Sequence, residues 1–185
     1  MVDFTLRVDE QTELRLLQEE DAEEELALWR ENHKEYLRWF PGDYESKGLE
    51  GTREWIRSNL ERFSSNRGFA VGIWHQGDLA GMIDLQEIDW VNRKSGLAYW
   101  LGAAFQGKGL MTMACRAVVD HAFGEMKLNR IEIRCAPDNV KSCAVAQRLG
   151  FKHEGVLRQS ELLRGRYLDH VVYAILREDH AREHI

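Results

Sequence analysis

The segment Gln106-Gly107-Lys108-Gly109-Leu110-Met111 decides how the rest of the sequence is interpreted. It follows an apolar, strand-like run, Leu97-Ala98-Tyr99-Trp100-Leu101, and precedes a helical pattern that continues to about Phe123. Glycines let the main chain turn tightly, and the first amides of a helix carry partial positive charge. The segment therefore predicts a strand–turn–helix unit that binds a phosphate or pyrophosphate. An ordinary strand-to-helix connection is the alternative, because a third glycine and a Gly-Lys-Ser/Thr ending are both missing.

Further motifs along the chain link this turn to a known family. Gln106-x-x-Gly109-x-Met111 resembles the Q/R-x-x-G-x-G/A acyl-CoA-binding motif of the GNAT superfamily of N-acetyltransferases, with methionine at a position that is usually small. Asn139-Val140-Lys141-Ser142 and Arg148-Leu149-Gly150-Phe151 follow it. Their spacing is similar to that of the branch that acetylates protein N-termini, the Rim-type (RimJ/RimL-like) ribosomal-protein enzymes. The resemblance extends from Glu13-Leu14-Arg15-Leu16 to the closing strand near Ala174.

The order of the predicted elements agrees with that resemblance. Phe69 to Trp74, Leu79 to Ile88 and the strand before Gln106 are expected to form an antiparallel meander, since short loops connect them. Because a helix intervenes, the strand from Asn129 to Cys135 is expected to lie parallel to the one that ends at Leu101. The resemblance implies an α/β acetyltransferase fold with a mixed, mostly antiparallel sheet of about seven strands flanked by four helices. Residues 1–185 are expected to form a single GNAT domain.

The resemblance also implies an activity. We expect an acetyl-CoA-dependent N-acetyltransferase that acts on a primary amine, with the N-terminal α-amine of a protein, such as a ribosomal protein, as the leading acceptor. A small amine, either a polyamine or an antibiotic, is the alternative acceptor. A non-catalytic acyl-CoA-binding module is an alternative from another class, and Met111 is the departure from the motif that favours it.

Several residues are assigned to the cofactor on these grounds. Backbone groups of the glycine turn are expected to hold the pyrophosphate, and exposed backbone groups near Trp100 and Leu101 to pair with the pantetheine arm and polarise the thioester. Asn139 is assigned to the same arm, although capping of the following helix alone accounts for it. The residues assigned to acetyl-CoA are Trp100, Leu101, Gln106, Gly107, Lys108, Gly109, Leu110, Met111, Asn139 and Ser142.

Two residues are assigned to the acetyl transfer itself, which needs a base to free the amine lone pair and a proton source for the thiolate. Glu161 matches the point in the strand where Rim-type enzymes have a glutamate assigned as the base. Glu154 and Asp84 are the alternatives. Ser142 matches the family's serine, assigned as the proton donor. The competing interpretations are a solvated strand glutamate and a serine that bonds a backbone amide at a helix start.

Composition restricts the class of protein. A chain of 185 residues is long enough for one domain with a sizeable core. Its net charge of −6 argues against a general nucleic-acid binder and is compatible with a cationic acceptor. No apolar run approaches the length of a membrane span and no signal pattern is evident, so we expect a cytoplasmic protein. Cys115, Cys135 and Cys143 are expected to be buried free thiols.

The remaining features carry weaker predictions. Trp39 and Phe40 are expected in the core, with the acceptor cleft as the alternative. Arg164 and Arg166 are expected in a solvated hairpin turn, with an acidic substrate segment or the CoA 3′-phosphate as alternative partners.

The end of the chain carries further expectations. His180 and His184 have the spacing of a helical metal pair, but no third ligand is evident and no metal is predicted. Residues 179–185 are expected to be a frayed tail. Apolar residues on an edge strand are compatible with a homodimer.

Overall fold

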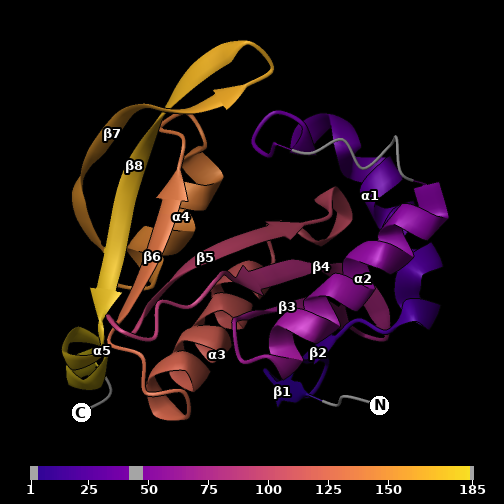
Figure 1. Ribbon diagram of the computed structural model, residues 1–185, viewed down its shortest axis with the longest axis horizontal. Coiled ribbons are helices and arrows are strands. Elements are labelled where there is room, and N and C mark those ends of the chain that lie inside the picture. Colours follow the sequence, from indigo (N-terminus) through magenta and orange to yellow (C-terminus); the bar gives the residue numbers. More distant parts are fainter. Residues whose placement is uncertain (1–3, 42–47, 184–185) are drawn as a thin grey trace.

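The computed structural model describes residues 4–41 and 48–183, which form one mixed sheet with helices on both faces (Figure 1). Within these residues the sheet has eight strands in the order β1-β2-β3-β4-β5-β6-β8-β7. The strands are β1 (Thr5–Arg7), β2 (Thr12–Leu16), β3 (Phe69–His75), β4 (Asp78–Leu85), β5 (Lys94–Leu101), β6 (Arg130–Cys135), β7 (Lys152–Leu163) and β8 (Arg166–Leu176). Strands β5 and β6 pair in parallel and the other neighbouring strands in the described sheet are antiparallel. The expected mixed, mostly antiparallel α/β fold is confirmed.

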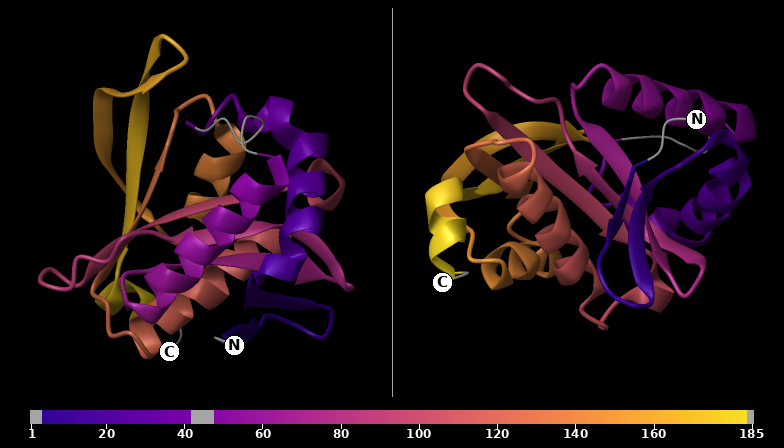
Figure 2. Two further views of the ribbon diagram at one scale, coloured as in Figure 1. Left: turned by 45° about the vertical axis from the view of Figure 1, so that its right-hand side comes forward. Right: turned by 90° about the horizontal axis from the view of Figure 1, so that it is seen from below.

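The helices lie in two layers (Figure 2). They are α1 (Ala22–Tyr36), α2 (Gly48–Ser64), α3 (Leu110–Gly124), α4 (Val140–Arg148) and α5 (Arg177–Glu183). Strand β3 shows why both faces are covered: Val71 and Ile73 point into the main core with α3 and α4, whereas Ala70 and Trp74 point into a second core with α1 and α2. A strand buried on both faces is apolar along its whole length, which explains the continuous hydrophobic run in β3.

The central parallel pair is short, and this shapes the site. Strands β5 and β6 pair from Lys94 to Gly96 and from Arg130 to Glu132. Beyond that point β5 continues its ladder with β4 and β6 continues with β8, so the two halves of the sheet diverge (Figure 1). The connection between β5 and β6 contains α3, as parallel pairing requires. The sheet therefore opens at the carboxyl ends of β5 and β6.

Two elements differ from the sequence expectation of about seven strands and four helices. Strand β1 has three residues, too few for a recognisable pattern, and pairs with β2. The end of the chain is helical to Glu183 as α5, where the sequence predicts a frayed tail from Asp179. Contacts with remote segments anchor α5: Lys152 Nζ lies 2.5 Å from Asp179 Oδ1, and His180 Nε2 lies 2.7 Å from Asp120 Oδ1.

Two further expectations concern membrane-spanning helices and metal ligands. None of the helices in residues 4–41 and 48–183 is both long and apolar enough to cross a membrane. Over the same residues, no group of three or more His, Cys, Asp or Glu side chains is placed to hold a metal ion. His184, the second member of the proposed histidine pair, lies outside the described residues.

Candidate active site

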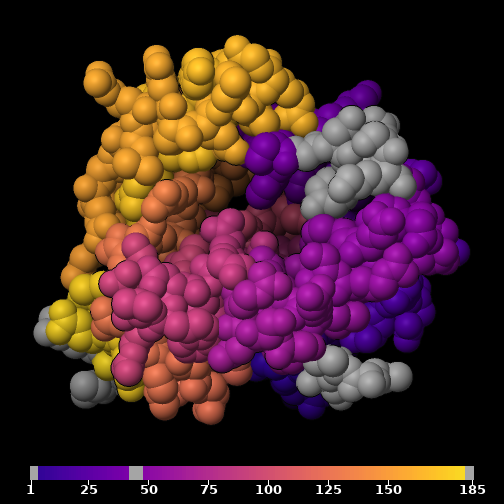
Figure 3. Space-filling view, viewed as in Figure 1, coloured from indigo at the N-terminus to yellow at the C-terminus, as the bar shows by residue number. Residues whose placement is uncertain are grey.

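A cleft of about 1420 Å³ occupies the opening between β5 and β6. Figure 3 shows its mouth as a hollow between the C-terminal hairpin, in yellow and orange, and the N-terminal helices, in purple. Its volume exceeds the roughly 300–1,000 Å³ of a typical small-molecule pocket, so it has room for a large cofactor and an acceptor together. One end is lined by the start of α3 and by α4, and the other by the end of α1 and by β7 and β8.

The glycine turn forms the first of these ends and has the predicted strand–turn–helix geometry. Gly107 and Gly109 have φ angles of +78° and +80°, in the left-handed region that favours glycine. A Cβ added at either glycine would meet no atom within 4 Å, so the space above the turn is open. Gly109 is the N-cap of α3, and the first amides of a helix have no partner within that helix. The arrangement is that of an anion site at a helix N-terminus.

Two basic side chains from α4 lie beside this turn, and the sequence interpretation does not include them as ligands. Lys141 Nζ donates to Gln106 Oε1 at 2.7 Å, and Arg148 Nη1 donates to Thr112 Oγ1 in the first turn of α3 at 3.2 Å. Both residues line the cleft. They lie about two helical turns apart, a spacing that puts them on one face of α4 and is visible in the sequence. They add positive charge where the helix dipole already favours an anion.

Gln106 and Met111, the two ends of the motif, have structural roles. Gln106 Nε2 donates to the carbonyl oxygen of Leu101 at 2.9 Å, which ties the turn to the end of β5. The Met111 side chain is 9% exposed, belongs to the main core and contacts Cys115 Sγ at 3.6 Å. Its backbone amide can therefore serve an anion whatever the size of the side chain. Lys108 Nζ lies over the Phe105 ring at 5.6 Å, so its side chain has a partner outside the cleft lining that the structure describes.

The middle of the cleft brings Ser142 to a tyrosine that the sequence interpretation does not assign. Ser142 Oγ donates to the Tyr99 hydroxyl at 3.1 Å, and that hydroxyl donates to the backbone oxygen of Ser142 at 3.0 Å. Burial raises the pKa of Tyr99 well above its usual value, so the phenol keeps its proton at neutral pH. Asn139 Oδ1 accepts from Ser142 N at 3.2 Å, which confirms Asn139 as the N-cap of α4. Trp100 and Leu101 line the cleft beside these groups.

Glu161 lies at the other end of the cleft, opposite His170 of β8. Glu161 Oε2 is 3.1 Å from His170 Nε2, and both side chains are mostly buried and line the cleft. A bulge precedes Glu161: between the pairs Leu157–His170 and Glu161–Leu168, three residues of β7 lie opposite one residue of β8. Bulges bend a strand and redirect its side chains. Figure 1 shows the hairpin bending toward the end of α1.

The bulge is held by backbone conformation and by one hydrogen bond. Gln159 has a φ angle of +51°, and its N–H donates to Asp169 Oδ1 at 2.7 Å. These contacts fix the part of β7 that presents Glu161 to the cleft.

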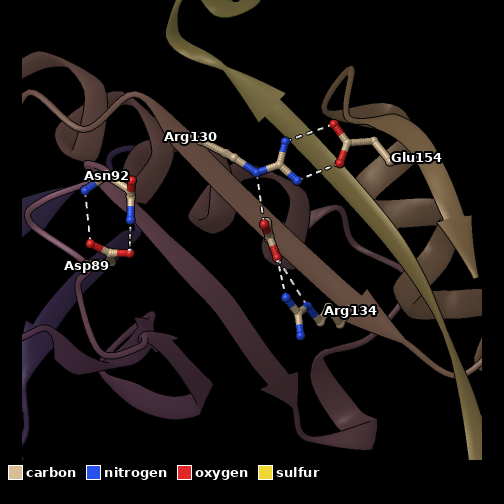
Figure 4. A network of polar contacts seen from close by, with 6 residues as sticks. Asp89, Asn92, Arg130, Arg134 and Glu154 are labelled. Carbon is tan, nitrogen blue, oxygen red and sulfur yellow. Dashed lines mark hydrogen bonds and ion pairs between the residues drawn. The ribbon is translucent and has the colours of Figure 1, made fainter. Parts of the chain in front are cut away.

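The two alternative bases face other partners. Asp84 Oδ1 lies 2.5 Å from Arg62 Nη2 at the α2 side of the sheet, and burial raises the pKa of Asp84 despite that neighbour. Glu154 receives two hydrogen bonds from Arg130, of 2.8 and 2.5 Å, in the network of Figure 4, and Arg130 holds the pKa of Glu154 below its usual value. The same network joins Arg130 and Arg134 through Glu132. Of the three candidate carboxylates, Glu161 is the one that lines the cleft.

The end of the cleft formed by α1, β7 and β8, called the acceptor end because the amine is expected there, has an aromatic wall. Trp39 and Phe40 are half-buried and line the cleft, so their assignment to the core is wrong, and neither belongs to the core clusters of the described residues. The Tyr36 ring packs edge-on against Trp100 at 4.2 Å and lies 5.3 Å from Phe40. Pro41 also lines the cleft, and it is the last residue described before position 48.

Arg164 lies in an exposed hairpin turn, as expected, and also reaches the end of α1. Its Nη1 donates to the backbone oxygens of Leu37 and Phe40, the latter at 3.2 Å. Arg164 and Gly165 form the two-residue turn between β7 and β8, both with positive φ. The hairpin tip is therefore tied to the end of α1 across the mouth of the cleft.

Comparisons with known proteins agree with this geometry. The family model described as acetyltransferase (GNAT) domain matches residues 11–152. The chain belongs to the GNAT acetyltransferase family. It is 36% identical over 177 residues to the putative ribosomal N-acetyltransferase YdaF of Bacillus subtilis (strain 168), which covers 95% of this chain and 97% of that protein. It is 32% identical over 175 residues to the ribosomal-protein-serine acetyltransferase of Escherichia coli (strain K12), with 92% and 95% covered.

Other GNAT relatives differ in acceptor or carry a bound ligand. The spermidine N(1)-acetyltransferase of Escherichia coli (strain K12) is 29% identical over 120 residues, with 65% of this chain and 63% of that protein covered. The solved structure of RimL, a ribosomal alpha-N-protein acetyltransferase, superimposes with a TM-score of 0.89 at 28% identity and covers 95% of this chain and 99% of that chain. That structure contains coenzyme A joined to a cysteine by a disulfide.

Proposed function

We propose that this GNAT protein transfers the acetyl group of acetyl-CoA to the N-terminal α-amine of a protein, with a ribosomal protein as the leading acceptor. The observation that carries the proposal is one cleft that joins the amide-lined start of α3 to the Glu161–His170 pair. The relatives named for ribosomal-protein acetylation support the acceptor class. The coenzyme A in the RimL structure supports the cofactor.

The end of the cleft formed by α3 and α4, the cofactor end, binds the anionic part of acetyl-CoA. The first amides of α3, together with Lys141 and Arg148, hold the pyrophosphate. Beyond Gly96, the edge of β5 that diverges from β6 accepts the pantetheine arm as an added strand. A β5 amide near Trp100 then polarises the thioester carbonyl and stabilises the charge that develops on its oxygen.

The remaining residues of the site take part in proton transfer. Glu161 takes the proton of the incoming ammonium, and the free amine then attacks the thioester carbon. His170 holds the carboxylate of Glu161 toward the cleft. When the carbon–sulfur bond breaks, the amine nitrogen loses its second proton, and the Ser142 hydroxyl, oriented by Tyr99, passes a proton to the leaving thiolate and is reprotonated from solvent. Because a thiolate is a good leaving group, this last step contributes less than the base.

A polyamine is the second candidate acceptor. The side chains of Glu35, Glu87 and Glu161 all line the cleft, and several carboxylates suit a multiply charged amine. The relative named spermidine N(1)-acetyltransferase supports this class more weakly, because it covers less of the chain.

A panel of acceptors tests the proposal. Acetyl-CoA is supplied with a peptide that has a free N-terminal serine or alanine, with the same peptide blocked at its N-terminus but containing a lysine, and with spermidine. We expect the free N-terminus to be the best acceptor, because an α-amine has a pKa of roughly 8 against about 10.4 for lysine and is more easily deprotonated. Greater turnover of spermidine would move the protein to the small-amine class. Acetyl-CoA binding without turnover of any amine would identify a binding module.

A further inference from the structure

Two cysteine side chains face each other beside the cleft, and one of them lines it. Cys135 is the last residue of β6 and lines the cleft, and Cys143 lies in the first half of α4, directly after Ser142. Their Sγ atoms are 3.2 Å apart. Cys135 is 5% exposed, whereas Cys143 is half-buried, so the expectation that all three cysteines are buried is wrong for Cys143. Cys115 is fully buried on α3.

Both cysteines sit on well-anchored backbone. Cys135 pairs with Val171 in the β6–β8 ladder, and α4 is capped by Asn139. A disulfide requires a sulfur–sulfur distance of about 2.05 Å, so the two sulfur atoms must approach each other by about 1 Å. We propose that Cys135 and Cys143 form a dithiol site that low-molecular-weight disulfides oxidise to an internal disulfide.

The reaction proceeds by two thiol–disulfide exchanges. Burial raises the pKa of Cys135 to about 12, so the more exposed Cys143 begins the reaction. The thiolate of Cys143 attacks one sulfur of the reagent RSSR, a mixed disulfide forms and the first RS⁻ leaves. Cys135 loses its proton to solvent and attacks Cys143 Sγ, the internal bond forms and the second RS⁻ leaves. The protein loses two electrons and two protons, and RSSR becomes two RSH.

The attack of Cys135 is slow because its pKa is raised, but the short distance between the two sulfur atoms compensates for this. Cys135 Sγ lies next to Cys143 Sγ before the reaction starts, so the step is intramolecular and benefits from a high effective concentration. The same proximity limits the lifetime of the mixed disulfide.

The internal disulfide is expected to disturb the cleft. Cys143 shares the start of α4 with Lys141 and Ser142, which contact Gln106 and Tyr99. Movement of Cys143 toward the end of β6 changes both contacts, so we expect weaker acetyl-CoA binding and lower activity in the oxidised protein. A ligand in the cleft covers Cys135, and acetyl-CoA should therefore slow the second exchange.

Intact-mass spectrometry of the full chain after incubation with oxidised glutathione tests the proposal. We expect a loss of about 2 Da, two of the three cysteines protected from alkylation, and recovery of mass and activity with a dithiol reductant. Cys135→Ser should stop at the mixed disulfide, with a gain of about 300 Da. Cys115→Ala, which changes the cysteine outside the pair, should still lose about 2 Da.

Other outcomes contradict the proposal. A wild-type protein that stays fully reduced, or that ends as a stable glutathione adduct, has no internal exchange. A loss of about 2 Da that persists in Cys143→Ser would assign the disulfide to another pair. Circular dichroism of each variant before oxidation verifies that the fold is retained.

Discussion

The two ends of the cleft are built in different ways. The cofactor end comes from one continuous part of the chain, β5 to α4, in which backbone amides and two basic side chains converge. The acceptor end is assembled from the end of α1 and the β7–β8 hairpin, which are far apart in sequence. Its chemistry lies in side chains such as Glu161 and Trp39. Local backbone geometry therefore determines the cofactor end, whereas tertiary contacts determine the acceptor end. We expect substitutions at one end to leave the function of the other end unchanged.

The largest effect of a substitution on activity is expected at the acceptor end. Glu161→Gln keeps the shape of the side chain but removes its basicity, so kcat should fall by roughly 100-fold or more. The affinity for acetyl-CoA should not change, because Glu161 lies at the opposite end of the cleft. Steady-state kinetics with a saturating peptide measures the first quantity, and calorimetry measures the second. The remaining rate should rise with pH as free amine becomes available in solution.

Glu154→Gln is the matched control for that variant. Glu154 is on the same strand but pairs with Arg130, so its loss should leave kcat close to that of the wild type. Near wild-type turnover in Glu161→Gln would mean that Glu161 is a solvated strand residue. The base would then be Glu154, Asp84 or a water molecule.

The second-largest effect, on the affinity for acetyl-CoA, is expected at the glycine turn. Gly109→Ala places a Cβ in the open space above the turn and strains a φ of +80°, so the Kd for acetyl-CoA should rise about tenfold. Gly165→Ala is the control, because Gly165 has a φ of +78° and the same open surroundings but lies in the hairpin turn. The control should lose similar stability and no acetyl-CoA affinity. Equal affinity in both variants would place the anion site elsewhere.

Smaller effects are expected from the basic residues of α4. Arg148→Gln and Lys141→Gln should each raise the Kd for acetyl-CoA by about two- to fivefold, and added salt should reduce the difference. Lys108→Gln is the comparison, because Lys108 belongs to the motif but lies over the Phe105 ring. An effect of Lys108→Gln larger than that of the other two would show that the motif lysine holds the anion.

The smallest effect is expected at the hairpin tip. Arg164→Gln removes the contacts with Leu37 and Phe40, so the KM for a peptide acceptor should rise about threefold as the mouth of the cleft loosens. The Kd for acetyl-CoA should stay constant. Arg166→Gln, two residues away on the exposed start of β8, should change neither value. A change of acetyl-CoA affinity in Arg164→Gln would contradict the separation of the two ends.

The same division explains how far the sequence predicts the structure. The fold and the cofactor end have local signals: a strand, a glycine turn and a helix follow one another around Gly109, and a crossover helix specifies the parallel pair. Lys141 and Arg148 have such a signal in their spacing on α4, although the interpretation of the motif omits them as ligands. These features depend on residues that are neighbours in the chain.

The acceptor end has no comparable signal. Glu161 is assigned from family resemblance, because the bulge that bends β7 depends on Gln159 and Asp169, which come from different strands. Trp39 and Phe40 look like core residues, since large aromatic side chains are usually buried, and only the assembled fold makes them a wall of the cleft. The helical end of the chain likewise depends on Lys152, a residue of a remote segment.

A double-mutant cycle tests the central claim, that the two ends of the cleft act separately. The kcat/KM for acetyl-CoA is measured at saturating peptide for the wild type, Gly109→Ala, Glu161→Gln and the double variant. Effects at independent sites add in free energy within about 0.5 kcal/mol, so we predict that the loss in the double variant equals the product of the single losses within about twofold. A double variant whose loss differs from that product by about tenfold or more would show that the glycine turn and Glu161 belong to one coupled unit, and would contradict the account.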